Sequence, residues 1–453
     1  MNETVRYNWL RSGSYNLLLN LQALIFGFGG FYLLVRLLDK HSFGIWTLFI
    51  ATTTIFEMAR GGLTLNATIK FLSQANDAER ASIITASFFL SGIVVLCCII
   101  LNISIAWYLA DIWRYPGLVK MFYLYSLVYL LQSFLTQFQC IEQSRLSFAG
   151  VLLSSLVKQA GFFIYILFCF LEKHQTSLIN LIYAQGLSVL AGVVIEYFYV
   201  RKDLSFVIKL EWIWIRKLFN FGKYVFGTSI SGVLSTTVNQ MMLGALLSPD
   251  AAGAFNVSGK IINLIDVPTN ALGPVIFPQS AKRFESQGNE AVKYLYEKSV
   301  GTILALLVPS LLLLFLLPGL VVHIIAGYQY PEAIPIVRVI VLCALINPFM
   351  RMFGPVLDSV GKPKINFLIV FIFTFINLPL NYVFIKIFGI IGAVYATLVA
   401  DILIYAAMAV ILKREFAINP LNAFIYATRF YPEFVVAYIK PKFKRRDQSR
   451  IEK

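Results

Sequence analysis

The sequence predicts an all-α polytopic membrane protein with about 12 transmembrane helices in two six-helix lobes. Of its 453 residues 58% are hydrophobic, and the mean hydropathy is +0.75. A membrane-spanning helix needs about 20 mostly apolar residues, so this apolar content matches about twelve spans. Charged residues make up only 13% of the chain. A soluble multidomain enzyme is therefore excluded, because it could not bury so much apolar surface.

Apolar runs long enough to cross a bilayer recur along the whole chain and are separated by short polar segments. A later apolar stretch, residues 419–440, is interrupted by Arg429, Pro432 and Glu433, so we expect it to lie at the membrane surface instead of crossing. The predicted spans are residues 14–38, 43–72, 82–109, 116–140, 147–171, 177–200, 219–247, 252–278, 299–326, 331–356, 364–387 and 389–412.

The distribution of basic residues predicts the orientation. With the N-terminus in the cytoplasm, the inner segments hold most of the 38 Lys and Arg residues. The outer loops then hold only Lys40, Arg114, Lys173 and Lys386. Basic loops are retained on the cytoplasmic side, so we expect both termini there. The formal charge of +15 reflects these loops and does not indicate a nucleic-acid partner.

A basic loop divides the twelve spans equally. An offset of 209 residues aligns Gly44 with Gly253 and Glu57 with Asp266, which indicates parallel repeats related by an axis along the membrane normal. Halves of this kind commonly rock around a central cavity. The predicted parts are an N-terminal lobe at 1–200, a basic cytoplasmic linker at 201–218, a C-terminal lobe at 219–412, and an interfacial segment with a polybasic cytoplasmic tail at 413–453.

Two tryptophans in the linker, Trp212 and Trp214, are expected to anchor it among the lipid headgroups. The polybasic end, residues 440–446, is expected to be attracted to anionic membrane lipids, with docking of a partner as the alternative.

The sequence carries no sign of bond-making chemistry. The five cysteines lie in apolar segments and the three histidines are far apart, so we expect neither a disulfide framework nor a metal site. The loops are short and contain no Walker-type glycine loop, which excludes ATP-driven transport by this chain alone. A membrane-embedded glycan polymerase or ligase would need a larger outer loop. We therefore expect a protein that is not an enzyme and has no cofactor.

Ionisable residues near the middle of the predicted spans are the candidate functional residues, because a charge at that depth is costly and usually faces a cavity or a partner. Lys158 is the sharpest signal, since its own span offers no acid three or four residues away. Glu57 and Arg60 share a helix face and could instead form a structural pair. The candidate cavity cations are Arg60, Lys158, Lys260 and Arg338, and the candidate acids are Glu57, Asp266 and Asp401.

This surplus of cations favours an anionic substrate. A pyrophosphate would suit, because Arg and Lys bind phosphate oxygens well. The acids could pair with the cations or take up protons or sodium, which would couple transport to an H⁺ or Na⁺ gradient. The prolines of the eighth and tenth spans fit an alternating-access carrier, and they fit a channel as well.

Several short motifs, in their order and spacing, resemble those of one transporter family. They are the first outer hairpin at Leu37–Trp46, the stretch Gly327–Pro335, the motif Gly361–Lys364, the Asn377 and Asn381 stretch, and Phe388–Ala393. The chain resembles the bacterial O-antigen and capsule flippases of the multidrug, oligosaccharidyl-lipid and polysaccharide exporter superfamily, over nearly its whole length.

The resemblance implies two six-helix lobes around a V-shaped cavity. It also implies that undecaprenyl-pyrophosphate-linked oligosaccharide units move from the cytoplasmic to the outer leaflet. These units would serve the biosynthesis of lipopolysaccharide O-antigen, capsule or exopolysaccharide. The family's cavity cations are thought to hold the pyrophosphate, and Arg60, Lys158 and Lys260 are the nearest positions here. The partners that the resemblance implies are the lipid-linked oligosaccharide, membrane lipids and the glycan polymerase machinery.

The chain differs in two respects from related branches of the superfamily, the lipid II flippases and the drug antiporters. The chain lacks the two additional spans that lipid II flippases usually have. Drug antiporters of the superfamily typically carry an acid in span one or seven, where this chain has Asn16, Asn20, Gln22, Asn239 and Gln240. An ion-coupled multidrug antiporter is therefore the second interpretation, ahead of a membrane-embedded enzyme or an assembly scaffold.

Overall fold

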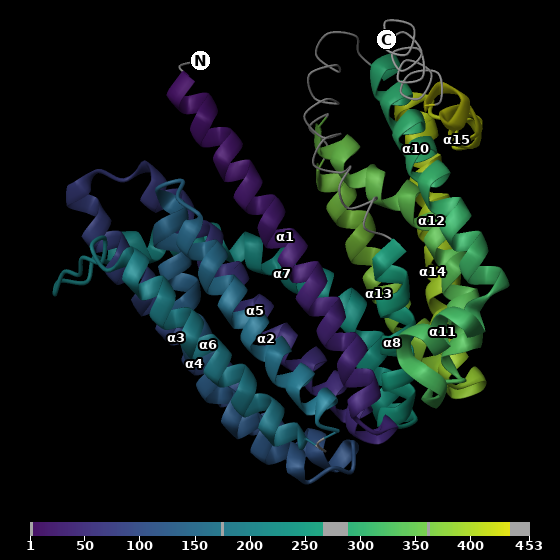
Figure 1. Cartoon of the computed structure of the whole chain (residues 1–453). Coiled ribbons are helices and arrows are strands. Elements are labelled where there is room, and N and C mark those ends of the chain that lie inside the picture. Colours follow the sequence, from purple (N-terminus) through teal and green to yellow (C-terminus); the bar gives the residue numbers. More distant parts are fainter. Residues whose placement is uncertain (1–2, 174–175, 266–288, 360–362, 435–453) are drawn as a thin grey trace, which may run out of the picture. The chain divides into compact units, whose positions relative to one another are not determined.

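Long helices make up nearly all of the chain that the structure describes (Figure 1). This computed structural model describes residues 3–173, 176–265, 289–359 and 363–434. By its internal contacts the chain divides into two units, Met1–Gly253 and Ala254–Lys453. The first unit contains α1 (Glu3–Leu37), α2 (Lys40–Gln74), α3 (Asp77–Ile112), α4 (Gly117–Ser144), α5 (Ala149–Leu171), α6 (Leu178–Val200), α7 (Trp212–Leu246) and the start of α8 (Pro249–Ile265).

Capping residues set where several of these helices begin. The Asp39 carboxylate accepts hydrogen bonds from the backbone N–H groups of His41 and Ser42, both at 3.1 Å, which satisfies free donors at the start of α2. Ser177 caps α6 in the same way through the N–H of Asn180. Asn76 and Glu79 form a capping box at the start of α3. Side-chain caps therefore set the starts of α2, α3 and α6.

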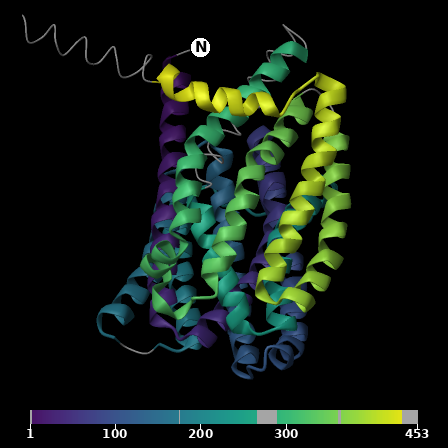
Figure 2. The same ribbon diagram turned by 90° about the vertical axis from the view of Figure 1, so that its right-hand side faces the viewer.

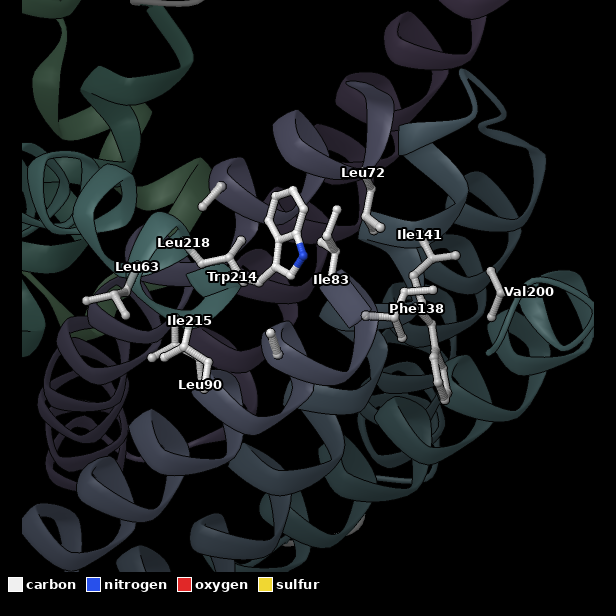
Figure 3. Packing of buried hydrophobic residues seen from close by; sticks show 13 residues of the cluster. Leu63, Leu72, Ile83, Leu90, Phe138, Ile141, Val200, Trp214, Ile215 and Leu218 are labelled. Carbon is white, nitrogen blue, oxygen red and sulfur yellow. The ribbon is translucent and has the colours of Figure 1, made fainter. Parts of the chain in front are cut away.

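The core of the first unit lies where α2, α3, α4, α6 and α7 meet (Figure 3). Trp214 is only 9% exposed there, and its ring packs against Phe71 of α2. The prediction that Trp214 anchors in the headgroups is therefore wrong. Trp212, two residues earlier on α7, is 69% exposed. The two indoles lie about 200° apart around the helix, so only one of them can face outward.

Hydrogen bonds between side chains hold α3 against α4. Ser87 bonds Gln137 at 2.7 Å, and Ser91 bonds Ser133 at 2.8 Å. Both pairs are buried. Apolar burial gives little drive for helices to associate in lipid, so interhelical hydrogen bonds and close packing of small residues take its place.

Helices α2 and α7 run antiparallel and touch along much of their length. A Cβ atom at Gly222 would overlap the carbonyl oxygen of Leu63, and one at Gly244 would lie 2.6 Å from the Leu48 side chain. Glycine is therefore required at Gly222 for the two backbones to approach so closely.

The second unit is also helical, and its core includes Ile336 and Cys343 of α12 and Val394 of α14. Figure 2 shows α15 lying across the direction of α12 and α14. Glu297 of α10 fixes the start of α15, since its carboxylate accepts from Asn419 N–H and Asn422 Nδ2. The helices of this unit are α10 (Asn289–Leu316), α11 (Pro318–Ala326), α12 (Ala333–Ser359), α13 (Pro363–Phe388), α14 (Ile390–Phe416) and α15 (Leu421–Phe434), with the 3₁₀ turn η1 (Gly327–Gln329) after α11.

The structure confirms the predicted all-α membrane fold. Ten helices in the described ranges are long and apolar enough to cross a membrane. One span was wrong: the range 299–326 is split at Leu317, because Pro318 starts the separate helix α11. The eighth predicted span, 252–278, extends beyond the described residues. The predicted lobe boundaries stay a prediction.

Candidate functional site

Glu57 lies midway along α2 and is held by a tyrosine from α4. The Tyr125 hydroxyl donates to Glu57 Oε1 at 2.8 Å, and Gln185 of α6 donates to that hydroxyl at 3.2 Å. The Tyr125 side chain is 2% exposed, and its ring meets the Tyr129 ring edge-on, with centroids 4.9 Å apart. The carboxylate is therefore fixed by a chain of donors that crosses three helices.

Arg60 lies one turn further along α2 and is 4% exposed. Its Nη1 donates to Thr136 Oγ1 of α4 at 3.2 Å, while its buried Nε has no hydrogen-bond partner. Glu57 is close enough to interact electrostatically with Arg60, yet the structure records no ion pair between them among the described residues. The guanidinium thus keeps donor capacity that the protein does not use.

Lys158 is half-buried on α5 and forms no hydrogen bond or ion pair with another described residue. The charges that act on it are those of Glu57 and Arg60. On α6, Gly192 makes room for its stem, because a Cβ there would lie 3.1 Å from the Ser154 carbonyl oxygen and 3.5 Å from Lys158 Cβ. The structure therefore brings two cations, Arg60 and Lys158, around a single acid, Glu57. We call Glu57, Arg60, Tyr125, Lys158 and Gln185 the central polar cluster.

The remaining predicted residues belong to the second unit. Lys260 on α8 and Arg338 on α12 are exposed, and Asp401 on α14 is half-buried. None of the three forms a hydrogen bond or ion pair with another described residue, and Asp401 has Cys343 of α12 near it. Asp266 lies outside the described residues. The structure thus groups Glu57, Arg60 and Lys158, and it records no contact among Lys260, Arg338 and Asp401 in the described ranges.

The sequence of the chain matches a known family over residues 33–335, under the description "Polysaccharide biosynthesis protein". The chain belongs to this family. An uncharacterized membrane protein of Methanocaldococcus jannaschii is 28% identical to it over 187 residues, which are 40% of this chain and 36% of that protein. A probable low-salt glycan biosynthesis flippase of Haloferax volcanii is 22% identical over 46% of this chain and 45% of its own length. The chain spans less than half the length of either archaeal relative.

A relative that matches over nearly the full length of the chain occurs in Klebsiella pneumoniae. It is an uncharacterized membrane protein in the cps region, 20% identical over 95% of this chain and 87% of its own length.

Two kinds of solved transporter share the fold. A multidrug transporter of the MATE family, in an inward-facing conformation, has a TM-score of 0.72 and covers 87% of this chain and 95% of its own. The lipid II flippase MurJ, in an inward closed conformation, has a TM-score of 0.70 and covers 94% of this chain and 93% of its own. Each is 13% identical to the chain. This family member is therefore a multi-pass membrane protein whose fold is that of the two solved transporters.

The sequence analysis missed the uncharged half of the central polar cluster. Tyr125 and Gln185 fix Glu57, but tyrosine and glutamine are too common in membrane helices to stand out. It also missed a buried acid pair at one end of the first unit. Glu142 and Glu196 are 5% and 0% exposed, and their carboxyl groups are in contact. Glu196 is the only ionisable residue of α6 apart from tyrosines, and that signal could have found it.

Proposed function

We propose that this protein moves undecaprenyl-pyrophosphate-linked oligosaccharide units from the cytoplasmic to the outer leaflet of a bacterial inner membrane. The units serve the synthesis of O-antigen, capsule or exopolysaccharide. The proposal rests on one observation above all. Lys158, half-buried near the middle of α5, has no hydrogen-bond or ion-pair partner among the described residues and shares one acid with Arg60.

The energetic argument concerns the cost of that lysine. A Lys at the centre of a membrane helix costs about 2.5–3.5 kcal/mol on insertion scales. Glu57 offsets part of this cost, but its Oε1 is already taken by Tyr125. The central polar cluster therefore keeps a net positive charge that an anion would neutralise. A pyrophosphate offers several oxygens, enough to accept from the Lys158 ammonium and the Arg60 guanidinium together.

Transport by this site follows from its chemistry. Arg60 and Lys158 bind the pyrophosphate, Glu57 sets their positions, and alternating access exposes the cluster first to one leaflet and then to the other. No bond of the substrate is made or broken. Lys260 and Arg338 are proposed as further cations along the path, and Asp266 and Asp401 as groups that carry a coupling proton or sodium ion. Glycan polymerase machinery takes up the flipped unit.

The decisive experiment uses a strain depleted of this protein. An impermeant probe on intact spheroplasts reports in which leaflet the lipid-linked oligosaccharide accumulates. Complete units shielded from the probe support the proposal. Normal arrival in the outer leaflet contradicts it and favours the MATE-like alternative, export of cationic drugs, for which resistance of a sensitised strain is the readout.

A further inference from the structure

The segment that joins α6 to α7 is attached firmly to the first unit. The backbone N–H of Val207 donates to Thr85 Oγ1 of α3 at 3.0 Å. Glu211 accepts from Ser82 Oγ at 2.8 Å, and the Phe206 ring meets the Phe88 ring edge-on at 5.3 Å. Three successive contacts therefore hold residues 206–211 along α3, where the sequence suggested only a linker.

These contacts use the acids of the segment and leave three of its bases free. Asp203 forms an ion pair with Arg145, and Glu211 accepts from Ser82. Lys202, Lys209 and Arg216 are all exposed, and none forms a hydrogen bond or ion pair with another residue in the described ranges. The surface thus presents three cations that no group among the described residues neutralises.

Large apolar side chains stand exposed between these cations. Phe206 is 58% exposed, Ile208 107%, Trp212 69% and Ile213 59%. The outward direction of Trp212 and Ile213 is fixed, because the opposite face of α7 is buried through Trp214, Ile215 and Leu218, which belong to the core of the unit. This surface alternates basic side chains with aromatic and aliphatic ones. It matches a membrane interface, where anionic headgroups lie above apolar acyl chains.

We propose that residues 202–217 form a membrane-surface segment that binds the headgroups of anionic phospholipids. Lys202, Lys209 and Arg216 contact the phosphate groups, while Trp212 and Ile213 enter the boundary between headgroups and acyl chains. Phospholipid is preferred over the polyprenyl pyrophosphate substrate because the segment lies at the ends of α6 and α7, away from the mid-helix positions of the central polar cluster. This proposal does not depend on the transport function.

The test compares two triple variants of the full chain in detergent, each titrated with phosphatidylglycerol and with phosphatidylcholine. The first is K202Q/K209Q/R216Q. The matched control is R114Q/K120Q/K173Q, which removes the same kinds of charge from other exposed positions of the first unit. Each base near an anionic surface contributes a factor of about 5 to binding, so the first variant should lose on the order of 100-fold in phosphatidylglycerol affinity. The control should stay within about twofold of wild type.

Equal affinity of wild type and the first variant would overturn the proposal, and so would an equal loss in both triple variants. If the first variant does not fold, Lys209→Gln alone serves, because Lys209 touches no other described residue through hydrogen bonds or ion pairs. A polyprenyl pyrophosphate that displaces phosphatidylglycerol from this surface at equal concentration would also overturn the choice of lipid.

A second measurement follows Trp212 directly. Brominated phosphatidylglycerol should quench the fluorescence of the wild type more than brominated phosphatidylcholine does. Trp212→Phe should abolish that difference, and Trp107→Phe, at a residue of 67% exposure, should keep it. A difference that survives in Trp212→Phe contradicts insertion at this residue.

Discussion

His41 Nδ1 lies 3.1 Å from Asp250 Oδ1, and the two residues are 209 positions apart. That separation equals the offset that aligns the two halves in sequence, so these two residues occupy equivalent positions of the predicted repeats. Gly44 and Gly253, the next equivalent pair, are also in contact, since a Cβ at Gly253 would lie 3.2 Å from Gly44 Cα. The starts of α2 and α8 therefore meet.

Gly44→Ala tests this close approach. A Cβ atom at Gly44 would overlap the carbonyl group of Pro249, so the substitution should force the two helices apart. Overpacking of this kind costs about 1–3 kcal/mol. We expect a lower melting temperature in detergent and weaker export of glycan units in cells.

The matched control for Gly44 is Gly61→Ala on the same helix, where a Cβ would meet nothing within 4 Å. Alanine there should stabilise the helix by about 0.5–1 kcal/mol. If Gly44→Ala melts at the same temperature as Gly61→Ala or above it, the contact does not matter for stability.

Asp39 gives a pH-dependent prediction outside the membrane spans. Partial burial opposes its ionisation, but hydrogen bonds from Ser42 and His41 outweigh burial and hold the pKa of Asp39 below its ordinary value of 3.8. A carboxylate with a lowered pKa stabilises the folded state fully above that ordinary value, and this stability is lost as pH falls through the lower folded pKa.

Asp39→Ala should therefore destabilise the protein by about 1 kcal/mol at neutral pH, as the loss of a helix N-cap does. The gap in melting temperature between wild type and variant should narrow only below pH 3.8. Thermal unfolding of both proteins, monitored by circular dichroism at several values between pH 3 and 7, measures this difference in melting temperature. A gap that is constant down to the lowest pH, or one that closes well above 3.8, would show that ionised Asp39 is not the cap.

Lys158 should show opposite effects on transport and stability. Lys158→Met removes an unpaired mid-membrane cation, which should stabilise the protein by about 1–3 kcal/mol while export falls at least tenfold. Lys158→Arg should keep part of the export, because the positive charge remains. Lys120→Gln, at an exposed lysine near the start of α4, is the control. Export at the wild-type level in Lys158→Met would remove Lys158 from the proposed pyrophosphate site.

The sequence could locate Lys158, Glu57 and Arg60 because a charge inside an apolar run is visible without a structure. It could not show which of the seven candidates meet, since that depends on how α2, α4, α5 and α6 pack. Tyr125 was hidden for the same reason: its role comes from the 2.8 Å contact with Glu57, not from its residue type. Trp214 was misplaced because the buried face of α7 is set by the core it enters.

Tyr125→Phe isolates the hydrogen bond to Glu57 while keeping the ring contact with Tyr129. Loss of a hydrogen bond to a charged group costs about 1.5–3 kcal/mol. We expect a lower melting temperature and reduced export, because Glu57 would lose the donor that positions it beside Arg60 and Lys158. In a Glu57→Gln background the same substitution should cost clearly less, and a double-mutant cycle measures the difference. Purely additive effects would mean that Tyr125 does not act through Glu57.

The acid pair gives the last prediction. Glu142 Oε1 accepts from Ser147 Oγ and Gly150 N–H, and its Oε2 accepts from Val151 N–H at 2.9 Å, so it satisfies free donors at the start of α5. Glu196 accepts from Ser154 Oγ, and no donor in the described ranges reaches its Oε1.

Glu142→Ala should therefore leave buried N–H groups without acceptors and cost about 1–3 kcal/mol for each lost partner. Glu196→Gln should be neutral or stabilising, because the amide keeps an acceptor for Ser154 and adds a donor that can face Glu142. Melting temperatures of the two single variants, measured side by side in one detergent, decide the matter. The assignment fails if Glu196→Gln destabilises the protein as much as Glu142→Ala, since the two carboxyl groups would then be equally committed as acceptors.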